Sequence, residues 1–88
     1  MSELETASEH LDAAASATVD KAASERLADL SGQLADLATA DHGADHGRLA
    51  RIQSALKDLG SGDAADVADE IQAADDAINE YRSDLEGV

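Results

Sequence analysis

The sequence predicts an all-α fold, an up-down antiparallel four-helix bundle. Apolar residues recur at helical spacings of three and four, the chain has no proline, and no run of β-branched or aromatic residues alternates with a period of two. A chain of 88 residues is long enough for one small domain only. We therefore expect a single helical domain over residues 1–88, with helices at about 3–17, 19–40, 46–59 and 64–86.

The first two helices are inferred from two apolar stripes that do not share one register. The stripes are formed by Leu4, Ala7, Leu11 and Ala14, and by Leu27, Leu30, Leu34 and Leu37. Because neither stripe extends into the other, we expect a break near residues 16–20, with Thr18 as the N-cap of the second helix. The alternative is a three-helix bundle in which the first two helices are merged or kinked. A merged helix of about 35 residues would be roughly 50 Å long and would imply a dimer.

The last two helices are inferred from two further stripes, which a glycine-rich break separates. The stripes are formed by Leu49, Ile52, Leu56 and Leu59, and by Val67, Ile71, Ala74, Ile78, Tyr81 and Leu85. Gly60-Ser61-Gly62 is expected to end the third helix, because glycine adopts the left-handed conformation that is common at helix C-termini. Asp63 is the expected N-cap of the fourth helix, and Asp66 places a negative charge near the positive end of its dipole.

The charge of the chain is strongly negative, since 20 Asp and Glu stand against 6 Lys and Arg and give a formal net charge of -14. Nucleic acid is not an expected partner, because that affinity comes mostly from Lys and Arg at phosphates. Such a composition is typical of an acidic, halophilic protein, whose like charges barely repel when 1 M salt shortens the Debye length to about 3 Å. We therefore expect the chain to need high K⁺ or Na⁺ for folding.

The sequence also predicts where the protein resides. It has no stretch of about 20 consecutive apolar residues that could span a membrane, and its N-terminus is acidic where a secretory signal would be basic. We therefore expect a cytoplasmic protein without a membrane partner. Because the chain has no cysteine, a disulfide scaffold, a Cys-based zinc finger and a thiol nucleophile are excluded. No cofactor is expected.

One segment has the residue types of a metal site. Residues 41–47 read Asp-His-Gly-Ala-Asp-His-Gly, so two Asp-His-Gly triplets recur four residues apart. Imidazole and carboxylate are metal ligands, so His42 and His46, with Asp41 or Asp45, are candidates to hold Zn, Ni or Cu in a turn. The competing interpretation is a plain helix–helix connection, in which the glycines turn the chain and an aspartate caps the next helix.

Three residues are candidates for contact with a partner, namely Arg48, Arg51 and Tyr81. The two arginines are close together in the sequence and would form an anion site at the start of the third helix. Alternatively, their stems lie along apolar surface and their guanidinium groups pair with nearby carboxylates. Tyr81, followed by Arg82, would be exposed and contact a partner. Alternatively, Tyr81 packs in its apolar stripe and its hydroxyl reaches solvent. His10 is expected to be a partly exposed residue at the edge of the first helix.

The sequence contains no recognisable catalytic pattern. The acidic residues of the last helix have helical spacing rather than the spacing of a calcium loop, and there is no Glu-x-x-His pair of the di-iron type. No histidine lies at catalytic spacing from a plausible nucleophile. We therefore expect a non-enzymatic helical protein that contacts itself, as a homodimer, or another protein. The alternative is a small metal- or ligand-binding protein that uses the His42/His46 turn.

Two segments carry a resemblance to a known family. Residues 41–51 read Asp-His-Gly-Ala-Asp-His-Gly-Arg-Leu-Ala-Arg, and residues 81–88 read Tyr-Arg-Ser-Asp-Leu-Glu-Gly-Val. In these segments the chain resembles a small uncharacterised haloarchaeal family of helical proteins, a domain of unknown function. Members of that family are expected to have proline where this chain has Ala44. The resemblance implies a haloarchaeal source and a helical fold, and it implies no activity.

Overall fold

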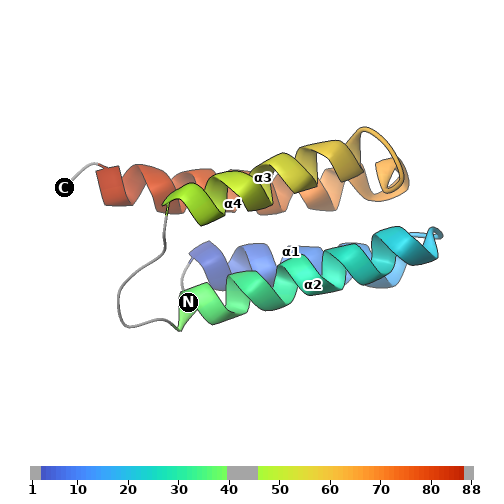
Figure 1. Cartoon of the computed structure of the whole chain (residues 1–88), viewed down its shortest axis with the longest axis horizontal. Coiled ribbons are helices and arrows are strands. Elements are labelled where there is room, and N and C mark those ends of the chain that lie inside the picture. The colour runs from blue at the N-terminus through green and yellow to red at the C-terminus, as the bar shows by residue number, and fades with distance from the viewer. Residues whose placement is uncertain (1–2, 40–45, 87–88) are drawn as a thin grey trace.

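Four antiparallel helices account for nearly all of the chain that the computed structural model describes, which is residues 3–39 and 46–86 (Figure 1). The order of elements is α1 (Glu3–Ala17), α2 (Lys21–Ala38), α3 (His46–Gly60), a short 3₁₀ helix η1 (Ala65–Val67), and α4 (Ala68–Glu86). The bundle measures 40 × 20 × 20 Å. The described residues contain no strand, so the predicted all-α four-helix bundle is confirmed.

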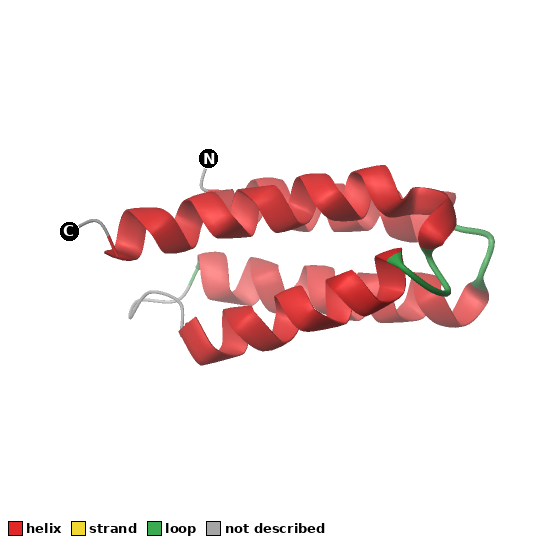
Figure 2. Ribbon diagram, turned by 90° about the horizontal axis from the view of Figure 1, so that it is seen from above, coloured by secondary structure: helices red, strands yellow, loops and turns green. Residues whose placement is uncertain are grey.

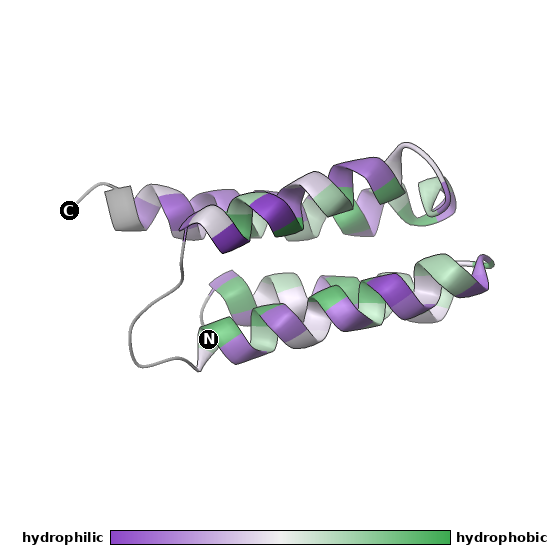
Figure 3. Ribbon diagram, viewed as in Figure 1, coloured by the Kyte–Doolittle hydropathy of each residue, from purple (hydrophilic) through white to green (hydrophobic). Residues whose placement is uncertain are grey.

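The core is formed by the apolar stripes that the sequence predicts. Hydrophobic and hydrophilic residues alternate along each ribbon, as amphipathic helices require (Figure 3). The fully buried large side chains are Leu4, Leu11, Leu27, Leu30, Leu34, Leu49, Leu56 and Ile78. Alanines fill much of the remaining core, and those buried are Ala7, Ala14, Ala23, Ala64, Ala74 and Ala77. No helix in the described ranges is both long and apolar enough to cross a membrane.

The connection between α1 and α2 confirms the predicted break and corrects its cap. The chain leaves the helix at residues 18–20, so the alternative of a merged first helix is wrong. Asp20, not Thr18, is the N-cap of α2: its side chain accepts a hydrogen bond of 2.8 Å from the Ala23 N–H. The Thr18 hydroxyl does not cap the helix but donates a hydrogen bond of 2.8 Å to the Asp66 carboxylate.

The start of the last helix also differs from the prediction. The chain first forms η1, whose N-cap is Ala64 with no side-chain cap hydrogen bond, and α4 begins at Ala68. Asp63 is exposed and is not the N-cap, and the fully buried Ala64 occupies the N-cap position of η1. The break falls at Gly60 and Gly62 as predicted, but neither glycine has a left-handed backbone. A Cβ on Gly62 would lie 3.1 Å from the Asp58 carbonyl oxygen, so a close backbone approach favours glycine there.

Asp66 joins the two connections, which lie at the same end of the bundle (Figures 1 and 2). Its carboxylate accepts a hydrogen bond from the Val19 backbone N–H at 2.9 Å, in addition to the one from the Thr18 hydroxyl. These two bonds, the backbone one first, lower the pKa of the Asp66 carboxyl below its usual value. The expected role of Asp66 at a helix dipole is therefore secondary to a long-range contact between the α1–α2 connection and η1.

A pair of buried serines fixes the contact between α1 and α2. Ser8 and Ser31 are 8% and 3% exposed, and their hydroxyl oxygens are 2.9 Å apart. The Ser31 hydroxyl donates to the Ser8 carbonyl at 2.9 Å, and the Ser8 hydroxyl lies 3.1 Å from the Ser31 carbonyl. Because both side chains are small, the two helices approach closely and still satisfy these polar groups.

Enlarging one of these serines is expected to destabilise the protein more than removing its hydroxyl. Ser8→Ala should lower the free energy of unfolding by about 1 kcal/mol, because it removes a hydrogen bond between uncharged groups while the Ser31 hydroxyl keeps its bond to the Ser8 carbonyl. Ser8→Val should cost about 1–3 kcal/mol, because added methyl groups separate α1 from α2. Urea unfolding followed by circular dichroism measures both values. Equal costs for the two substitutions would show that the close approach of α1 and α2 is not tight at this point.

The Asp66 contact predicts a stability that depends on pH. Because the pKa of Asp66 is lowered by folding, its contribution is fully present above the ordinary carboxyl pKa of about 3.9 and is lost as the pH falls through the lowered value. Asp66→Asn should therefore lower the thermal midpoint at pH 7 and have a smaller effect at pH 3. Asp69→Asn, an exposed carboxyl in the first turn of α4, is the matched control. A loss of stability that is the same at both pH values would contradict the prediction.

Candidate functional site

Helix α3 is the least tightly held helix of the bundle. Helix α1 packs extensively against both α2 and α4, whereas α3 packs mainly against α4 and touches α2 at few points. The apolar face of α3 is short, and its buried residues are Leu49, Ile52 and Leu56, with Leu59 partly buried. The side of the bundle between α2 and α3 is therefore the most open one.

Polar side chains make much of the contact between α3 and α4. The Gln53 amide on α3 donates to Asp75 Oδ1 at 2.9 Å and to Asn79 Oδ1 at 2.8 Å. In return, Arg82 Nη1 on α4 donates to Gln53 Oε1 at 2.7 Å, and its Nε donates to His46 Nδ1 at 3.3 Å. Because water competes for such half-buried bonds, this contact is weaker than an apolar one of the same area.

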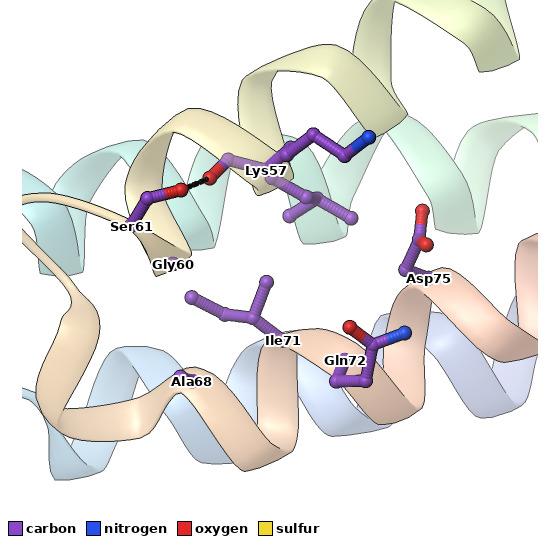
Figure 4. Close-up of a pocket in the computed structure, with 8 residues that line it drawn as sticks. Lys57, Gly60, Ser61, Ala68, Ile71, Gln72 and Asp75 are labelled. Atoms are coloured by element: carbon purple, nitrogen blue, oxygen red, sulfur yellow. Dashed lines mark hydrogen bonds between the residues drawn. The ribbon is translucent and has the colours of Figure 1, made fainter.

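Two adjacent hollows follow this polar contact along the α3–α4 seam. The first has a volume of about 180 Å³, and its aliphatic lining residues are Leu56 and Ile71. Gly60 and Ala68 lie at its end near the connection between α3 and α4 (Figure 4). The second, of about 380 Å³, is lined by Ala50, Gln53, Ser54, Lys57, Asp75, Asn79 and Arg82. Lys57 and Asp75 line both hollows, one from each helix.

A third hollow lies on the other flank of α3, against α2. We call it the arginine groove; it has a volume of about 210 Å³ and is lined by Arg26, Leu30, Gln33, Arg48, Arg51 and Ile52. The floor is apolar and closed, since Leu30 and Ile52 are 1% and 2% exposed. The predicted contact residues Arg48 and Arg51 therefore lie together, and Arg26 of α2 joins them.

Of the four predicted metal ligands, the structure describes His46. Asp41, His42 and Asp45 lie outside the described residues, and with them the expected aspartate cap. His46 begins α3, and its Nδ1 accepts the hydrogen bond from Arg82 Nε. Within residues 3–39 and 46–86, no group of three potential metal ligands comes together. Metal binding at the His42/His46 turn stays a prediction.

Tyr81 and His10, the other two residues discussed from the sequence, both contact neighbouring parts of the bundle. Tyr81 is half-buried and packs against the core, as the packing interpretation expected. His10 is partly exposed at the edge of α1, as predicted, and its Nδ1 lies 2.8 Å from Glu70 Oε2 on α4. Neither residue belongs to the hollows beside α3.

Sequence reasoning missed several residues of this region. Gln53 and Asn79, which hold α3 to α4, and Arg26, which completes the arginine groove, were not candidates. Arg82 was noted only beside Tyr81, and its contact with Gln53 on α3 was not predicted. Of these residues, Gln53 could have been found from the sequence, because it directly follows Ile52 of the apolar stripe. A polar side chain at the edge of a buried face needs a hydrogen-bond partner. The partners themselves come from helices far along the chain, and only the fold identifies them.

The loose packing of α3 predicts a gradient of local stability. Backbone amides of Ile52 and Leu56 on α3 should exchange with solvent about tenfold faster than those of Leu11 and Leu27, because fewer apolar contacts must break to open α3. All four side chains are almost fully buried, so exposure does not explain the difference. Native-state hydrogen exchange followed by NMR measures these rates. Uniform rates would show that the four helices open only together.

The comparisons with known proteins place the chain in a family and assign it no activity. It belongs to the Family of unknown function (DUF7553), whose family model matches residues 1–84. This finding agrees with the expectation of an uncharacterised family. No curated protein and no solved structure matches the chain.

Proposed function

We propose that this member of the DUF7553 family is a non-enzymatic interaction protein, which binds another protein or a second copy of itself through α3. The observation that carries the proposal is the position of α3, which is loosely packed and flanked by hollows on both sides. Elements that bind partners come from the less stable parts of a fold, because their contacts within the fold are incomplete.

The outer face of α3 supports this proposal. Four exposed residues form one ridge, because Arg51, Ser54 and Lys57 follow one another at a spacing of three and Ala50 lies four residues before Ser54. Ala50 and Ser54 are small and allow another backbone to come near. The two basic residues would be attracted to a partner with an acidic surface, and a second copy offers one on α1.

The charge of α3 differs from that of the chain as a whole. Arg48, Arg51 and Lys57 stand against a single acidic residue, Asp58, in a protein of net charge -14. We propose in addition that the protein acts in concentrated salt, where general repulsion between acidic surfaces is screened over a few ångströms. Contacts at short range, such as those of α3, are screened least.

Association should be visible in the molar mass of the purified protein. We expect size-exclusion chromatography with light scattering, in about 2–3 M KCl, to give a mass above the 9.0 kDa of one chain. Ala50→Arg on α3 should reduce that mass, because a long charged side chain blocks close approach at the ridge. Ala35→Arg, at an exposed alanine of α2, which is neither on the ridge nor on the acidic face of α1, is the matched control and should leave it unchanged.

The outcome that overturns this proposal is a strict monomer that also fails to capture any protein when immobilised in an extract of its own source at native salt. Capture that survives Ala50→Arg but not Ala35→Arg would keep an interaction protein and move its contact surface from α3 to α2.

A further inference from the structure

The arginine groove brings three of the six basic residues of this chain to one place. Arg26 comes from α2, and Arg48 and Arg51 come from successive turns of α3. Elsewhere the described surface is dominated by carboxylates, because the chain has 20 Asp and Glu. Half of the basic residues of a very acidic protein are therefore gathered at one hollow beside α3.

Two of these arginines have no carboxylate partner among the described residues. Within residues 3–39 and 46–86, Arg26 is the arginine with an ion pair to a carboxylate, at 3.2 Å from Asp29. The same Asp29 oxygen accepts a hydrogen bond from the Gln33 amide at 2.9 Å, so it holds the rim of the groove on α2. Pairing with nearby carboxylates was the alternative interpretation of Arg48 and Arg51, and over these ranges neither arginine forms an ion pair.

The shape of the groove limits the size of a ligand. Its volume of about 210 Å³ is below the roughly 300–1,000 Å³ of pockets that enclose drug-sized molecules. Its lining includes the buried Leu30 and Ile52, and an apolar lining strengthens electrostatic contacts that are made inside the groove. A group of a few heavy atoms that presents several charged oxygens fits these limits.

We propose that the arginine groove binds a small phosphoryl anion, such as inorganic phosphate, pyrophosphate or the phosphate group of a small metabolite. Planar guanidinium groups bind phosphate oxygens in pairs, and three guanidinium groups match a group with more than one negative charge better than they match a single carboxylate. The groove lies on the flank of α3 toward α2 and shares Arg51 with the ridge proposed above. Arg26 and Arg48 lie outside that ridge and the groove is formed within one chain, so anion binding does not require association.

The net charge of the protein does not prevent such binding. A charge of -14 repels anions at long range, but the Debye length is about 8 Å at 0.15 M salt and about 3 Å at 1 M. Distant carboxylates are therefore screened, while guanidinium groups in direct contact with the anion are screened much less. Asp29 contacts two residues that line the groove, since one of its carboxylate oxygens accepts hydrogen bonds from Arg26 and Gln33.

The test is a titration of the full-length, isotope-labelled protein with potassium pyrophosphate, followed by NMR at about pH 7.5 and at an ionic strength held constant with KCl. We expect saturable shifts for Arg48, Arg51 and Gln33. Arg48→Gln combined with Arg51→Gln should weaken binding about tenfold or more. Lys21→Gln combined with Lys57→Gln removes the same charge outside the groove and should leave the affinity within about twofold. Circular dichroism establishes that both variants keep their helices.

Three results would overturn the proposal. Shifts that KCl alone reproduces, or that never saturate, would show general screening and no site. Equal weakening in the two double variants would show that only the total charge matters. Succinate binding as tightly as pyrophosphate would show that the groove takes carboxylates and does not prefer a phosphoryl group. An intermediate loss in Arg48→Lys with Arg51→Lys would further support paired contacts from the guanidinium groups.

Discussion

The bundle depends on the close packing of α1 against two neighbours at once. The chain has few large apolar side chains, so its helices must approach closely if leucines from one are to fill the space left by alanines of another. The buried face of α1 is narrow enough for this, because three of its residues, Ala7, Ser8 and Ala14, are small. Helix α1 packs on both α2 and α4, and the remaining helix, α3, therefore receives the smallest share of the core.

Polar contacts hold those parts of the fold that the core does not fix. Asp66 connects the two chain reversals at one end, and Gln53 with Arg82 connects α3 to α4. In the described part of the chain, no buried polar side-chain atom lacks a hydrogen-bond partner. The polar groups therefore position the helices at little cost from unsatisfied groups, while the apolar stripe around α1 supplies the attraction.

The sequence predicts the helices well and the contacts between helices poorly, for a physical reason. Spacing of leucines and alanines reports which face of a helix is buried, and it correctly predicted four helices and the break after α1. Capping residues are harder, because Thr18, Asp20, Asp63 and Asp66 are all chemically able to cap a helix. The structure decides between them by a contact from Asp66 to residues nearly fifty positions away. Likewise, Arg48 and Arg51 could be chosen as candidates from their spacing, but the addition of Arg26 requires the α2–α3 seam.

The distribution of charge links the weak packing of α3 to its exposure. Helix α3 carries three basic residues and one acidic residue, and it lies on α4, which carries seven acidic residues and one arginine. Their attraction over several ångströms adds to the short polar contacts of Gln53 when the salt concentration is low. Concentrated salt screens that attraction but leaves the hydrogen bonds and strengthens apolar contacts where the salt is excluded from the surface. The same salt relieves the repulsion among the acidic faces of α1 and α4. Ionic strength therefore acts in opposite directions on the two halves of the bundle: it favours the packing around α1 and reduces the electrostatic hold on α3, which leaves this helix freer to exchange contacts within the fold for contacts with a ligand or partner.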